Sequence, residues 1–89
     1  MMMNKVLVRL IVPSLNNSYD IFIPVNEYIW KVTKLMVKSV SDLSRIDLDI
    51  TKKYALINQT TGKMYGINEK IIETDIRNAT ELVLLLCDN

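Results

Sequence analysis

The side chains that could do nucleophilic or metal chemistry are few in this sequence of 89 residues. It contains no histidine and one cysteine, Cys87. Catalytic triads and most zinc sites need histidine, so the composition excludes both kinds of site. A cysteine nucleophile needs a neighbouring base to become a thiolate, and Cys87 has no histidine to serve as that base. We therefore interpret Cys87 as an inert thiol and expect no catalytic residue.

Two short motifs resemble ligand-binding loops without completing them. Thr61-Gly62-Lys63 matches the end of a phosphate-binding loop, but the upstream glycine is missing. Asp47 and Asp49 have the alternate spacing of calcium ligands, but the third oxygen ligand, the glycine and the closing glutamate are absent. We interpret the first motif as a hairpin turn and the second as solvated loop carboxylates. The sequence thus predicts no metal site and no cofactor.

The overall charge and hydropathy point to a soluble protein. The 11 basic and 10 acidic residues give a net charge of +1, which does not favour nucleic acid or an anionic membrane as partner. No apolar run reaches the ~20 residues that span a bilayer, so we expect no membrane insertion. A single cysteine and the lack of a signal-peptide cleavage site favour a reducing compartment. We therefore expect a cytoplasmic protein.

One helix is expected among the elements that would position any site. After Asn26, apolar residues recur at spacings of three and four, which is the pattern of an amphipathic helix. Asn26 is a good N-cap residue, and the pattern fades near Ser44 and Arg45. The expected buried stripe consists of Ile29, Val32, Met36, Val40 and Leu43, with Thr33 and Val37 beside it.

The other side of this helix is a candidate binding surface. Lys31, Lys34 and Lys38 lie on one helix face and could contact phosphate or an acidic partner. Neighbouring acidic residues favour an ordinary solvated face instead. Trp30 lies just off the buried stripe and fits either a packed edge position or a partially exposed interface anchor.

Strand patterns flank the helix on both sides. Residues 5–12 alternate a purely apolar set with a mixed one, which is typical of a strand with one face in the core. The expected strands are 5–12, 19–24, 54–58, a very short 64–65, and 82–86. A lone helix must cover one face of the mixed sheet, so we expect a single two-layer α+β domain over residues 1–89, with four to five strands in the order β-β-α-β-β-β. The first and last strands are the most apolar and should lie side by side at the centre.

The segment before the last strand is distinctive. Residues 72–84 combine a turn, an isoleucine at Ile76, a polar turn and a closing strand. Together with the element order, this segment resembles the corresponding part of the ubiquitin-like β-grasp fold. Ubiquitin relatives often have Asn-Gly where this chain has Asn78-Ala79, so Ala79 must either avoid a positive φ or bear strain.

Two further segments narrow the resemblance. Residues 20–25, Asp20-Ile21-Phe22-Ile23-Pro24-Val25, lead into the helix, and residues 61–65 form the second hairpin. On these segments and Ile76, the chain is most similar to the small bacterial YukD/EsaB-like family of ubiquitin-like proteins associated with type VII secretion. That resemblance implies a cytoplasmic accessory or regulatory component of a secretion apparatus, with secretion-system proteins as partners. It supplies no catalytic residues.

The end of the chain bears on conjugation. Conjugating ubiquitins and sulfur-carrier β-grasp proteins need a free Gly-Gly carboxylate, whereas this sequence ends in Leu86-Cys87-Asp88-Asn89. We therefore expect that the protein is never activated or conjugated. The alternative is a ubiquitin-like modifier or sulfur carrier trimmed from a longer precursor. A nucleic-acid-binding β-grasp module would need a basic surface, which the near-neutral charge disfavours.

The open face of the sheet is the candidate partner-binding surface. If the apolar set of the first strand faces the helix, alternation places the other apolar strand residues on the open face. The resemblance to ubiquitin implies that Leu56 faces the helix and Ile57 faces the open side of the sheet. The expected binding residues are Leu7, Ile11, Ile57, Val83 and Leu85. Such a patch would cover several hundred Å², about the size at which exposure indicates interaction. The same face is a candidate homodimer interface.

Overall fold

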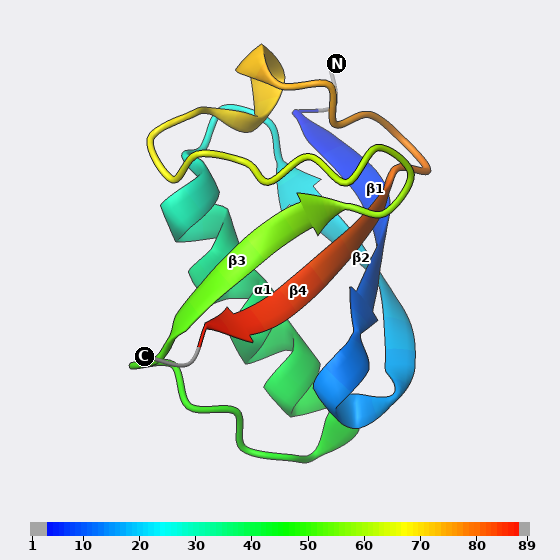
Figure 1. Cartoon of the computed structure of the whole chain (residues 1–89), viewed down its shortest axis with the longest axis vertical. Coiled ribbons are helices and arrows are strands. Elements are labelled where there is room, and N and C mark those ends of the chain that lie inside the picture. The colour runs from blue at the N-terminus through cyan, green and yellow to red at the C-terminus, as the bar shows by residue number, and fades with distance from the viewer. Residues whose placement is uncertain (1–3, 88–89) are drawn as a thin grey trace.

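The computed structural model describes residues 4–87 and contains a four-stranded sheet crossed by one helix (Figure 1). The elements are β1 (Lys5–Val12), β2 (Asn17–Pro24), α1 (Ile29–Ser44), β3 (Lys53–Asn58) and β4 (Glu81–Cys87), with 3-10 turns at Pro13–Leu15 and Ile71–Glu73. The strand order is β2-β1-β4-β3, with β1 and β4 parallel and both outer pairs antiparallel. The structure confirms the α+β class and the central position of the two most apolar strands.

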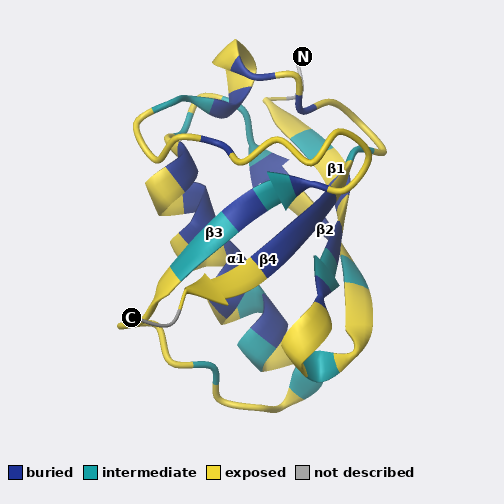
Figure 2. Cartoon of the chain, viewed as in Figure 1, coloured by how far each residue is buried: buried dark blue, intermediate teal, exposed yellow. Residues whose placement is uncertain are grey.

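The core lies between α1 and the inner face of the sheet. The inward residues of β1 are Val8, Leu10 and Val12, all at most 2% exposed, as their alternation predicts. The buried residues of the helix are Ile29, Val32, Thr33, Met36, Val37 and Val40. The other three strands contribute buried side chains to the same layer: Ile21 and Ile23 of β2, Leu56 of β3, and Leu82 and Leu84 of β4. Figure 2 shows this burial in the first half of β4 and on the sheet-facing side of α1, whereas the end of β4 is exposed.

The C-terminal end of the helix lies at Ser44, as expected, but its N-terminal end differs from the expectation. Asn26 is not the N-cap, because α1 begins at Ile29 with Tyr28 in the capping position. The amide of Ile29 donates to the Glu69 carbonyl at 2.8 Å, and the amide of Trp30 donates to the Ile67 carbonyl at 3.2 Å. These carbonyls satisfy the free amides that a capping side chain would otherwise satisfy.

Two apolar side chains whose spacing continues the inward rows of their elements lie at the margins of the core instead. Leu43, at the end of the predicted helix stripe, is 60% exposed, so the buried stripe ends at Val40. Leu86, on the inward parity of β4, is 44% exposed. The inner layer is therefore shorter than the apolar pattern predicts.

The expected fourth strand at residues 64–65 does not form. Its remnant is one isolated bridge between Ile57 and Met64, so the sheet has four strands in the described residues. The Asn58 side chain carbonyl accepts hydrogen bonds from the amides of Thr60 and Thr61, at 2.9 and 3.1 Å. Beyond Tyr65, whose amide still donates to the Leu56 carbonyl at 3.0 Å, the pairing stops, because the Gly66 amide donates to the Glu69 carboxylate at 2.7 Å.

A polar network holds the long connection after β3 against the sheet. The Tyr65 hydroxyl donates to the Asp75 carboxylate at 2.5 Å and accepts from the Asn58 side-chain amide at 3.0 Å. Tyr65 is 3% and Asn58 6% exposed. Burial, followed by the hydrogen bond to Asp75, raises the pKa of Tyr65 to about 12.

Four of the described residues adopt the left-handed conformation, and two of them, Gly62 and Ala79, lie in turns that the sequence analysis singled out. Gly62 has φ +76°, as expected for the hairpin turn. Ala79 has φ +72°, so this alanine bears the strain that a glycine would avoid. The amide of Ala79 donates to the Leu7 carbonyl at 2.8 Å, which fixes the turn beside β1.

Candidate partner-binding face

The open face of the sheet can be laid out in rows from the strand register. Ile11 of β1 is paired with Val83 of β4, and Val83 is paired with Ile57 of β3. Leu85 and its partner Ala55 form the next row. Because paired residues share one face of a sheet, these side chains are neighbours on the side opposite α1.

Met64 extends this apolar group, because it bridges to Ile57. We call the group the Ile57 cluster; it consists of Ile11, Ala55, Ile57, Met64, Val83 and Leu85. Four of the five residues predicted from the sequence therefore lie together in it. The same alternation argument could have predicted Ala55 from the sequence. Met64 could not be predicted in this way, because only the folded turn after β3 brings it beside Ile57.

Exposure varies across the Ile57 cluster. Val83 is only 9% exposed, because it lies between Ile11 and Ile57 in the same row. Leu85 is 37% and Met64 62% exposed. Val83 thus forms the floor of the cluster, and a partner would contact Leu85 and Met64 first.

Leu7 shares the face but lies apart from the Ile57 cluster. A charged row separates them, in which Arg9 is the paired neighbour of both Asp20 and Glu81. The Arg9 Nε and the Asp20 Oδ1 are 3.5 Å apart, and both side chains are more than half exposed. An exposed pair of this kind contributes little stability. The five predicted residues therefore occupy one face but two separate surfaces.

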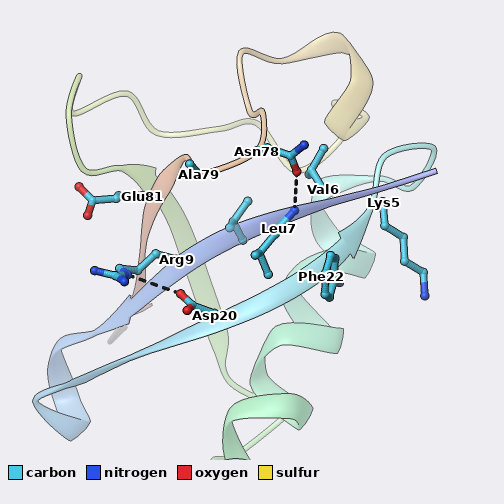
Figure 3. A pocket seen from close by; sticks show the side chains of 10 residues that line it. Lys5, Val6, Leu7, Arg9, Asp20, Phe22, Asn78, Ala79 and Glu81 are labelled. Carbon is cyan, nitrogen blue, oxygen red and sulfur yellow. Dashed lines mark hydrogen bonds and ion pairs between the residues drawn. The ribbon is translucent and has the colours of Figure 1, made fainter. Parts of the chain in front are cut away.

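The second surface is a groove around Leu7 (Figure 3). Leu7 is paired with Phe22 of β2, which is 57% exposed. On the other side lies the turn of Asn78 and Ala79, and the Asn78 Oδ1 accepts a hydrogen bond from the Leu7 amide at 2.9 Å. Phe22 was not among the predicted residues, although its place between Ile21 and Ile23 in the sequence was a sufficient signal, because strand alternation puts it on the face opposite to theirs.

The lysine face of α1 is partly engaged within the chain. Lys31 lies 3.4 Å from the Glu27 carboxylate, and the Lys34 ammonium lies 5.4 Å from the centre of the Trp30 ring. Trp30 is 43% exposed, so it is not a packed edge residue. With Lys38 also exposed, these observations favour a solvated face over an anion site.

The residues first considered for reactive or metal chemistry are dispersed. Cys87 is exposed at the end of β4, and its cross-strand neighbour is Lys53. Asp49 accepts hydrogen bonds from the hydroxyl and the amide of Thr51, which hold the pKa of its carboxyl below the ordinary value. Within residues 4–87, no group of three or more His, Cys, Asp or Glu side chains is placed to hold a metal ion.

The described part of the chain contains no helix with the length and apolar character needed to cross a membrane. The terminal residues 88–89, which enter the expectation about conjugation, lie outside the described residues.

Comparisons with known proteins give structural matches only. No protein family and no curated protein sequence matches the chain. Among solved structures, the ubiquitin-like domain of the type VII secretion system protein ECCD1 of Mycobacterium tuberculosis is similar with a TM-score of 0.72 at 13% identity, over 93% of this chain and 99% of that one.

A chain of the MycP5-free ESX-5 inner membrane complex is similar with a TM-score of 0.71 at 14% identity. That match covers 98% of this chain but 22% of the other, so this chain corresponds to a small part of its length. A component of a toluene 4-monooxygenase complex gives a TM-score of 0.73 at 8% identity, over 93% of this chain and 99% of that one.

At sequence identities this low, the structural similarity establishes the fold and nothing finer. Several of the other similar structures are ubiquitin-like domains of other proteins. The oxygenase component shows that the same fold also occurs within an enzyme complex. The chain has the ubiquitin-like β-grasp fold, and it shares that fold with a ubiquitin-like domain of a type VII secretion protein.

Proposed function

We infer that this protein is a non-catalytic protein-binding module, and that it acts in the bacterial cytoplasm as an accessory or regulatory component of a type VII secretion system. The observation that carries the binding role is the Ile57 cluster. Monomeric proteins rarely expose contiguous apolar patches larger than a few hundred Å², and larger patches mark interaction sites.

The geometry of the cluster suits a preformed docking surface. All its members except Met64 project from β1, β3 and β4, whose backbones are hydrogen-bonded to one another along the register. A partner therefore meets side chains that are already ordered, which lowers the entropic cost of binding. Val83 forms the buried floor, while Leu85 and Met64 offer accessible apolar area.

The secretion role has a different support. The sequence resembles the YukD/EsaB-like family, and two of the similar structures belong to type VII secretion proteins or their complexes. Under this proposal the partners are components of the secretion apparatus.

The test is purification of the tagged protein from its native cytoplasm, with wild type and Ile57→Asp compared. Ile57→Asp places a charge in the Ile57 cluster and should abolish capture of secretion components. Ile50→Asp is the matched control, because Ile50 is 63% exposed in the loop before β3. Leu85→Asp should behave like Ile57→Asp.

Circular dichroism must show that all variants remain folded. Capture of the same components by wild type and Ile57→Asp would refute the binding face. Capture of proteins unrelated to secretion, lost in Ile57→Asp, would support the face but refute the secretion role.

A further inference from the structure

The side chains of the groove around Leu7 form three evenly spaced rows. We call it the Leu7 groove; it has a volume of about 850 Å³ and is lined on the open sheet face by Lys5, Leu7, Arg9, Asp20, Phe22 and Glu81, with Asn78 and Ala79 at its side. Leu7 and its partner Phe22 form the middle row. The Lys5 row lies two residues to one side, and the Arg9 row lies two residues to the other.

The two ends of the groove carry opposite charge. Lys5 is the charged residue at one end, and its cross-strand partner is Pro24. At the other end, Arg9 lies between two carboxylates, those of Asp20 and Glu81, so that row has an excess negative charge. Neither Lys5 nor Glu81 forms an ion pair within the described residues. Figure 3 shows Lys5 and the Arg9 row at opposite ends, with Leu7 and Phe22 between them.

We propose that the Leu7 groove binds a second copy of this chain in a face-to-face, two-fold symmetric dimer. A two-fold interface requires a patch that is complementary to itself. A two-fold axis that runs across the strands at Leu7 places each Lys5 opposite the partner's Arg9 row, within reach of the Glu81 carboxylate that Arg9 leaves unpaired. The two-residue steps on either side of Leu7 are equal, about 7 Å each along a strand, so the two rows meet in register.

The middle of the groove supplies the apolar contact. Phe22 is 57% and Leu7 37% exposed, and the same axis brings each against its own copy. Aromatic rings that meet in this way prefer offset stacking and carry a large apolar area. The net charge of +1 gives little general repulsion between copies.

Charge reversal provides the test, because Lys5 and Glu81 are both exposed and their substitution spares the core. Sedimentation equilibrium of the full chain from roughly 10 µM to 1 mM should show a monomer–dimer equilibrium for wild type. Lys5→Glu and Glu81→Lys should each raise the dimer dissociation constant by about tenfold or more, because each creates two like-charge contacts.

Mixing these two variants should restore dimerisation. In the mixed dimer, the introduced glutamate of one copy faces the introduced lysine of the other, and the remaining native Lys5 faces the remaining native Glu81. Both contacts therefore join opposite charges again, and they should weaken as the salt concentration rises. Lys53→Glu is the matched control, because Lys53 lies at the far corner of the same face and should leave the dimer unchanged.

Three results would overturn the proposal. They are a wild type that stays monomeric at the highest concentration, single reversals that leave the dissociation constant unchanged, and a mixture that associates no better than its components. Loss of the dimer in Ile57→Asp but not in Phe22→Asp would assign self-association to the Ile57 cluster instead. None of these outcomes depends on whether the chain binds secretion components.

Discussion

Replacement of Tyr65 by phenylalanine probes how the connection between β3 and β4 is held. The substitution keeps the buried ring and removes a hydroxyl that donates to Asp75 and accepts from Asn58. The Asp75 side chain lies on an exposed residue and can be solvated, so its lost bond costs about 1 kcal/mol. Asn58 is 6% exposed, and its amide is left without that acceptor, which costs about 1 to 2 kcal/mol more.

The expected total is a loss of about 2 to 3 kcal/mol in the free energy of unfolding. For a domain of this size, such a loss lowers the melting temperature by roughly 10 to 20 °C. Urea unfolding followed by circular dichroism measures it directly. Asp75→Asn is the control, since it keeps an acceptor beside the hydroxyl and should cost less than ~1 kcal/mol.

The pH dependence gives a second readout of the same hydroxyl. The pKa of Tyr65 rises from 10.0 in the unfolded chain to about 12 in the folded one, so its contribution is fully present below pH 10. It is lost as the pH rises from 10 to 12, by about 2 to 3 kcal/mol in total. Tyr65→Phe should remove this part of the alkaline decline. A variant that unfolds within ~0.5 kcal/mol of wild type and keeps the decline would refute the reasoning.

Four further substitutions test strain and burial by urea unfolding. Ala79→Gly should stabilise the fold by about 1 kcal/mol, because φ +72° costs alanine more than glycine; an unchanged stability would show that the turn bears no strain. Gly62→Ala should destabilise by about 1 kcal/mol for the converse reason, since only its φ of +76° and no nearby atom opposes a side chain. Leu10→Ala should cost about 3 to 5 kcal/mol, because Leu10 is fully buried in a central strand, whereas Leu43→Ala should cost under ~1 kcal/mol at 60% exposure; equal losses would contradict the assigned core.

Local periodicity was sufficient for the features that depend on a single element. The inward row of β1 and the helix stripe from Ile29 to Val40 follow from spacing alone. The outward position of Ile57 needed the resemblance as well, because the alternation of β3 has no clear apolar side. These predictions succeed because burial of one face is decided by the element itself.

Features that depend on distant segments were not predictable in this way. The N-terminus of α1 is set by the carbonyls of Ile67 and Glu69, which replace the expected Asn26 cap. The expected strand at residues 64–65 is reduced to one bridge, and the next amide, that of Gly66, donates to the Glu69 carboxylate instead. No local pattern records such contacts.

The division of the candidate face has the same origin. Alternation places Leu7 and Ile57 on one face, but only the register between β1 and β4 places Arg9 beside Glu81, between the two apolar surfaces. A face defined from alternation alone therefore merges two surfaces that the paired strands keep apart.

The charged row that separates the two surfaces makes their functions independently testable. Ile11 and Val83 lie one row beyond Arg9 and Glu81, about 13 Å along β1 from the proposed dimer axis at Leu7. The Ile57 cluster therefore lies outside the rows that the proposed dimer pairs, and a dimer would present two copies of it. Lys5→Glu should then leave capture of each secretion component intact while it removes any gain from two-point attachment. Ile57→Asp should remove capture and leave the dimer unchanged, as two surfaces with no shared side chain require.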